Sequence, residues 1–175
     1  MDMRKTKFKA LAVICFLFIT AFSFAFQGEP DGFRGLKWGD KYDPAKFITI
    51  ERSHSDTDLA MGPRICLLAG DKMQIGIVDT EAPWYIFDEK DLLVGVSVRL
   101  KSGYNNYEFL LQALKIKYGQ PSAVTDTKQI VWEGEISEVS IGYVEEINAA
   151  FFTLFQKAYM EKSRKKSIDE VLNDL

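Results

Sequence analysis

The stretch that decides the fold is LLVGVSVRLKSGYNNYEFLLQALKIKYGQP, residues 92–121. Its first part alternates as a half-buried strand does, with these apolar side chains facing one way: Val94, Val96, Val98 and Leu100. The residues between them, Gly95, Ser97 and Arg99, predict that the other sheet face is wet or lightly covered. Its second part repeats apolar residues at helical spacing: Tyr107, Leu110, Leu111, Leu114 and Tyr118. A strand followed by an amphipathic helix over 105–118 is therefore expected.

The ends of this helix carry their own signals. Asn105 and Glu108 have the spacing of a capping box, which predicts the first turn. Gly119 and Pro121 follow the last apolar position and predict the stop. A glycine after a helix ends it, whereas the glycines of a phosphate-binding loop precede one.

Strand signals also precede residue 92. Alternating apolar residues over 65–69 and 73–77 flank Gly70–Asp71, which predicts a hairpin with a two-residue turn. PWYIF, residues 83–87, leads through the polar turn DEKD, residues 88–91, into the strand that begins the quoted stretch. Further upstream, Asp43–Pro44 predicts the start of a short helix.

Three more strand candidates follow the helix: QIVWE (129–133), EVSIGYV (138–144) and AAFFTLF (149–155). Gly134–Glu135 supplies a turn between the first two. The segment 149–155 also fits a helical stripe; we favour a strand that passes into helix near Gln156. The tail 167–175 has a capping box, Ser167 with Glu170, and predicts a short amphipathic helix that docks on the domain or serves as a handle for a partner.

These elements predict an α+β fold. An antiparallel sheet of about six to seven strands would be covered on one face by the 105–118 helix, with a second helix at the C-terminus. Residues 26–175 are long enough to bury a core as a single domain without a metal or disulfides.

The first 25 residues have the layout of a secretory signal peptide. Four basic residues precede the uncharged run 10–24, which as a helix would reach about 22 Å, short of the ~30 Å hydrocarbon layer. Ser23 and Ala25 place small side chains where signal peptidase accepts them, so we expect cleavage after Ala25. An anchor that is retained is the alternative. The expected location is periplasmic or extracellular.

The net charge limits the kinds of partner that are expected, and the cysteine content limits the disulfides. Residues 1–25 hold four of the 22 basic and one of the 25 acidic residues, so the processed chain has 18 and 24 and a net charge of −6. This acidic balance argues against nucleic acid or an anionic membrane as partner. Cys66 alone would remain after processing, so no intrachain disulfide is expected, and its place in a strand favours packing over reactivity.

Three motifs resemble a known group of proteins: FRGLKWGD (33–40), LLQALKIKYGQP (110–121) and VWEGEISEVSIGY (131–143). In this order they are similar to small exported bacterial proteins of unassigned function. The resemblance implies export and a compact α+β module, and it brings no catalytic residues. A fainter similarity, in the passage KYGQP, is to small envelope proteins of the outer-membrane-assembly and β-lactamase-inhibitor-like type.

Aromatic residues supply the candidate ligand-binding positions. Trp38, Trp84 and Tyr85 could line a pocket or a stacking face, because amphipathic rings gain from burial against a ligand. Packing in the core is the alternative. Trp38 is the strongest candidate, since the glycines around it expose the ring.

Few residues point to catalysis. His54, Asp56 and Asp58 would project to one side of an extended chain and could hold a divalent metal, which makes a metal-dependent hydrolase the alternative function. The other carboxylates fall at predicted turns, where solvation explains them: Asp88, Glu89, Asp91, Glu145 and Glu146. We therefore expect no cofactor and a non-enzymatic binding module of the bacterial cell envelope that contacts an envelope protein or ligand.

Overall fold

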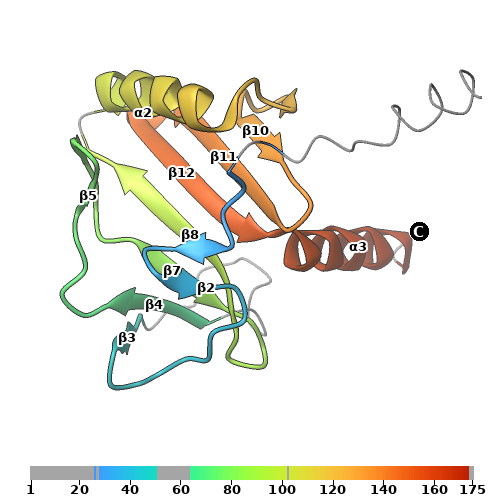
Figure 1. Cartoon of the computed structure of the whole chain (residues 1–175). Helices are drawn as coiled ribbons and strands as arrows, with labels where there is room; N and C mark the ends of the chain where they lie inside the picture. Colours follow the sequence, from blue (N-terminus) through green and yellow to red (C-terminus); the bar gives the residue numbers. More distant parts are fainter. Residues whose placement is uncertain (1–25, 27, 51–63, 102, 174–175) are drawn as a thin grey trace, which may run out of the picture.

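The computed structural model describes residues 26, 28–50, 64–101 and 103–173, and it has the predicted α+β fold (Figure 1). Its main sheet is antiparallel and has eight strands, one or two more than expected because it includes the short edge strands β3 and β9. In spatial order these are β3 (Phe47–Thr49), β4 (Arg64–Leu68), β7 (Trp84–Phe87), β8 (Leu93–Leu100), β12 (Ala149–Gln156), β11 (Ser137–Val144), β10 (Ile130–Glu133) and β9 (Ala123–Val124). Two small hairpins lie outside it: β1 (Gly32–Phe33) with β2 (Leu36–Lys37), and β5 (Gln74–Ile75) with β6 (Val78–Asp79).

The main sheet is built from two meanders that meet at its centre. One runs β3-β4-β7-β8 and the other β9-β10-β11-β12, so that the last strands of the two halves, β8 and β12, pair with each other. Each of these strands is followed by a helix, α2 (Gly103–Tyr118) after β8 and α3 (Lys157–Asn173) after β12. The segment 149–155 is therefore strand, and it passes into helix directly after Gln156, as expected.

Helix α2 lies across β8, β11 and β12 and covers one face of the sheet (Figure 1). The residues that the sequence pattern assigned to its inner face are all buried: Tyr107, Leu110, Leu111, Leu114 and Tyr118. They pack in a core with alternate residues of the strands, including Val96, Ile141 and Leu154. Burial of this apolar face, at about 25 cal/mol per Å², is the main force that holds the helix on the sheet.

The start of α2 was predicted wrongly, and its end correctly. The helix begins at Gly103, so Asn105 lies inside its first turn and does not cap it. It ends at Tyr118, where Gly119 adopts a φ of 80° and its N–H donates to the carbonyl of Lys115. A left-handed residue at this position is what glycine allows most readily.

The hairpin predicted over 65–69 and 73–77 is wrong. Strand β4 pairs with β3 and β7 instead, while β5 pairs with β6. Between β4 and β5 the chain is held by Arg34, whose guanidinium donates to the backbone carbonyls of Lys72 and Gln74. These contacts hold residues 72–74 against the turn between β1 and β2.

Residues 43–47 form a turn rather than the short helix expected at Asp43–Pro44. The carbonyl of Asp43 accepts the N–H groups of both Lys46 and Phe47, and its carboxylate accepts that of Ala45. Phe47 is buried and begins β3, so the chain enters the sheet after a single turn.

The C-terminal helix is longer than the predicted 167–175. It starts at Lys157, so Ser167 is mid-helix, with its hydroxyl donating to the carbonyl of Ser163 rather than capping a first turn. The expected docking of the tail is not seen in the described part of α3. Its apolar stripe is 59–62% exposed: Ile168, Val171 and Leu172. In Figure 1 the helix projects past the end of β12.

The sheet face opposite α2 is only partly covered. One row across it contains Trp84, Ser97, Thr153 and Ser140, which are paired strand to strand. Trp84 is 49% exposed, and the Ser140 and Thr153 hydroxyls lie 2.7 Å apart. This half-solvated face agrees with the alternation read from residues 93–100.

Candidate functional site: the Trp38 groove

The turn between β10 and β11 is fixed by a carboxylate from the N-terminal part of the chain. Glu29 accepts backbone N–H groups from Glu135 (3.1 Å), Ile136 (2.7 Å) and Ser137 (2.6 Å). Successive N–H groups that converge in this way form an anion-binding nest. Gly134 leaves room for this carboxylate, because a Cβ there would lie 2.0 Å from a Glu29 oxygen and the Glu29 side chain would have to shift. The turn is therefore preorganised by a residue more than 100 positions away.

Trp38 is held against the same turn. Its indole Nε1 donates to the Ser137 hydroxyl at 2.8 Å, and that hydroxyl donates to the carbonyl of Pro30. Ser137 is fully buried, whereas the Trp38 ring packs on the edge of the core and keeps part of its surface in solvent. The indole is thus oriented by a hydrogen bond and remains accessible along one side.

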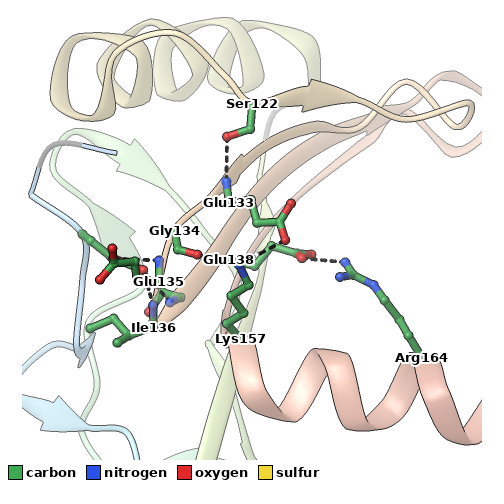
Figure 2. Close-up of polar contacts among 10 residues, drawn as sticks. Ser122, Glu133, Gly134, Glu135, Ile136, Glu138, Lys157 and Arg164 are labelled. Atoms are coloured by element: carbon green, nitrogen blue, oxygen red, sulfur yellow. Dashed lines mark hydrogen bonds and ion pairs between the residues drawn. The ribbon is translucent and has the colours of Figure 1, made fainter. Parts of the chain in front are cut away.

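Helix α3 braces the other side of the turn (Figure 2). Lys157 donates to the Gly134 carbonyl at 2.9 Å and pairs with Glu133 at 3.4 Å. Arg164 pairs with Glu138 at 2.5 Å, which fixes the second turn of the helix against β11. These contacts set the direction in which α3 leaves the domain.

Between Trp38 and the start of α3 lies a groove of about 350 Å³, which we call the Trp38 groove. It is lined by Asp31, Lys37, Trp38, Glu135, Ile136, Gln156 and Ala158. Ile136 is 47% exposed and adds aliphatic surface to the lining. Lys37 and Asp31 at its rim pair with each other at 3.2 Å, so their charges are balanced. The groove offers an aromatic and aliphatic recess with a polar rim, which suits an apolar side chain.

Trp84 and Tyr85 do not join Trp38. Because they are neighbours on β7, their side chains point to opposite sheet faces: Trp84 is half exposed, and Tyr85 is fully buried in the core. The Tyr85 hydroxyl donates to Asp71 at 2.6 Å, and Asp71 also pairs with Arg34 at 2.6 Å. Burial, and then the adjacent Asp71 carboxylate, raise the pKa of Tyr85 well above its ordinary value. This phenol stays protonated and serves the core.

The candidate metal ligands lie outside the described residues, whereas the carboxylates predicted at turns lie within them. His54, Asp56 and Asp58 lie outside the described residues; within those ranges no three His, Cys, Asp or Glu side chains are placed to hold a metal ion. Asp88 accepts two N–H groups of its own turn, and Asp91 pairs with exposed Arg64 at 3.0 Å. Glu145 and Glu146 lie exposed in the short helix η2 (Glu145–Ile147). These described carboxylates therefore accept hydrogen bonds within their turn, pair with a cation at the surface or are simply exposed.

Cys66 is completely buried in the core. Desolvation raises the pKa of its thiol, and the opposing hydrogen bond from Thr49 is long, at 3.9 Å. A buried thiol with a raised pKa is a poor nucleophile, which favours the packing interpretation.

Sequence reasoning identified Trp38 but missed Glu29, Ser137 and Ile136. Glu29 is one of 25 acidic residues, a type that is usually solvent-exposed. Nothing near it in the sequence indicates that its carboxylate binds the backbone of a distant turn. The role of Glu29 follows only from the tertiary structure, in which residues 29–31 lie against the β10–β11 turn.

Comparisons with known proteins add no family or function: no family model matches the chain, and neither a curated protein nor a solved structure matches it. Among the described residues, no helix has both the length and the apolar character needed to cross a bilayer.

Proposed function

We propose that this protein is an exported, non-enzymatic binding module that receives an apolar side chain of a protein partner in the Trp38 groove. The observation that carries the proposal is the combination of an accessible indole with walls fixed in advance by Glu29, Ser137 and Lys157. Preorganised walls lower the entropic cost of binding. Tryptophan is also among the residues that contribute most to interfaces.

The exposed part of α3 supports a protein rather than a small molecule as partner. Ala158, the second residue of the helix, lines the groove, and the apolar stripe of the helix near Leu172 is uncovered in the described chain. A partner that contacts both surfaces would bury more area than one that contacts either surface alone. Export remains part of the proposal and is supported by the layout of residues 1–25.

Site-specific photo-crosslinking in cells that express the full chain tests the binding surface. A benzophenone amino acid at Ile136 should crosslink to one discrete partner. The same group at Ile116, which is 87% exposed on the outer side of α2, should not. Trp38→Ala should abolish the crosslink from position 136, while Trp84→Ala, on the opposite sheet face, should leave it unchanged.

Two results would overturn the proposal. One is crosslinking from position 136 that survives Trp38→Ala or occurs equally from position 116. The other is turnover of hydrolase substrates by the folded, metal-free protein. Intact mass of the same sample tests export, because a processed chain should begin at Phe26.

A further inference from the structure

A second recess lies between the β1–β2 hairpin and helix α2, and its chemistry differs from that of the Trp38 groove. It has a volume of about 340 Å³ and shares no lining residue with that groove. Its floor is formed by Phe152 and Leu154 of β12, and its opposite walls include Phe33 from the hairpin and Leu114 from α2. It lies where neither covering element closes over the apolar face of the sheet.

The lining is apolar apart from two cationic side chains. Pro30, Gly32, Ile75, Leu110, Ala113 and Tyr118 complete the apolar part. Arg34 lines it too, but its guanidinium is engaged by Asp71 and by the Lys72 and Gln74 carbonyls. Lys117 differs from Arg34: it is exposed, and its Nζ lies 4.9 Å from the centre of the Tyr118 ring. Within the described residues, no carboxylate lies within ion-pairing distance of Lys117.

We infer that this recess binds a single medium-length acyl or alkyl chain with an anionic head, the head resting at Lys117. An apolar floor and walls favour a hydrocarbon chain, because burial of its surface drives binding. The volume is at the lower end of ligand pockets, which fits one chain rather than a two-chain lipid. The charge of Lys117 selects an anionic over a cationic head.

Amphiphiles of one chain length and opposite charge test this inference. Isothermal titration of protein purified after expression of the full chain should show saturable binding of decanoate and weaker binding of decyltrimethylammonium. Lys117→Glu should weaken the binding of decanoate about fivefold and strengthen the binding of the cationic amphiphile, because an attraction at an exposed site becomes a repulsion. Lys115→Glu, on the same helix but outside the lining, should change neither.

A variant whose recess is filled by a side chain distinguishes binding in the recess from binding elsewhere on the surface. Ala113 is an exposed lining residue, so Ala113→Trp should occupy the recess without disturbing the core and should abolish binding of both amphiphiles. Gln112→Trp places the same ring one position away, outside the lining, and should bind as the unmodified protein does. Both variants should unfold at the same temperature as the parent.

Three results would overturn the inference. They are absence of saturable decanoate binding, unchanged binding in Ala113→Trp, and an equal effect of the Lys117 and Lys115 changes. Because the two recesses share no residue, these results leave the Trp38 groove proposal intact, and failure of that proposal leaves this one intact.

Discussion

The carboxylate of Glu29 accepts the backbone N–H of Ser137 at 2.6 Å, although 108 positions separate the two residues. The contact joins the N-terminal segment to the turn that forms one wall of the Trp38 groove. It also accounts for a local choice of residue, since any side chain larger than that of glycine at 134 would displace this carboxylate.

Removal of this carboxylate should loosen the domain. Glu29→Ala leaves three N–H groups without their acceptor, and we expect the free energy of unfolding to fall by about 2 kcal/mol, since hydrogen bonds to charged groups are stronger than average. Urea denaturation measures this change. Glu135→Ala is the control, because its exposed side chain lies in the same turn and should change stability by less than about 0.5 kcal/mol. Equal effects of the two changes would contradict the role given to Glu29.

Tyr85→Phe should alter both the stability and its pH dependence. At neutral pH the loss of the hydrogen bond to Asp71 should cost about 1 kcal/mol. Burial and the Asp71 carboxylate raise the pKa of Tyr85, so above about pH 10 the unfolded state gives up a proton that the folded state keeps. Stability of the parent should therefore fall as pH rises through this range.

In Tyr85→Phe that alkaline decline should become shallower. It should not vanish, because the pKa values of other tyrosines, among them Tyr107 and Tyr159, are also raised by burial. Urea titrations at several alkaline pH values measure the slope. An unchanged slope in Tyr85→Phe would refute the assignment.

Truncation of a leucine to alanine should destabilise the protein strongly in α2 and only slightly in α3. Leu114 of α2 is 5% exposed, so Leu114→Ala should cost about 2–4 kcal/mol through lost burial and the cavity that remains. Leu172 of α3 is 62% exposed, so Leu172→Ala should cost less than about 0.5 kcal/mol. Thermal unfolding of both variants checks this. A large cost at Leu172 would mean that the tail docks on the domain after all.

The thiol of Cys66 should be inert in the folded protein. It is fully buried and its pKa is raised, so an alkylating reagent at mildly alkaline pH should modify it only after denaturant is added. Mass spectrometry of the peptide that contains Cys66 measures the modified fraction. Rapid modification without denaturant would favour a reactive thiol over a packing one.

Local periodicity was enough for the elements that the core holds. The alternation over 93–100 and the stripe from Tyr107 to Tyr118 predicted a strand, a helix and the face that each buries, and the structure confirms them. Local capping signals were less reliable. Asn105 and Ser167 both lie inside helices, because packing and chain continuity decided where α2 and α3 begin.

Strand pairing between segments not joined by a predicted turn was beyond the reach of the sequence. The run after Gly70 alternates like a hairpin partner of β4, yet β4 pairs with β7, while Arg34 donates to the carbonyls of Lys72 and Gln74. The pairing of β8 with β12 joins residues 50 to 60 positions apart, from Leu100 with Ala150 to Gly95 with Phe155. Which strands meet depends on contacts between segments that no local pattern encodes.

The amino-acid sequence by itself determined the α+β class, the helix that covers the sheet and Trp38 as a residue of interest, because burial of apolar side chains imposes a period on neighbouring positions. Only the tertiary structure decided that Tyr85 is buried while Trp84 is exposed, and brought Glu29 to the 134–137 turn beside Trp38. Both outcomes depend on which face of a strand is buried and which distant chain approaches it. Such relations arise when the whole core forms.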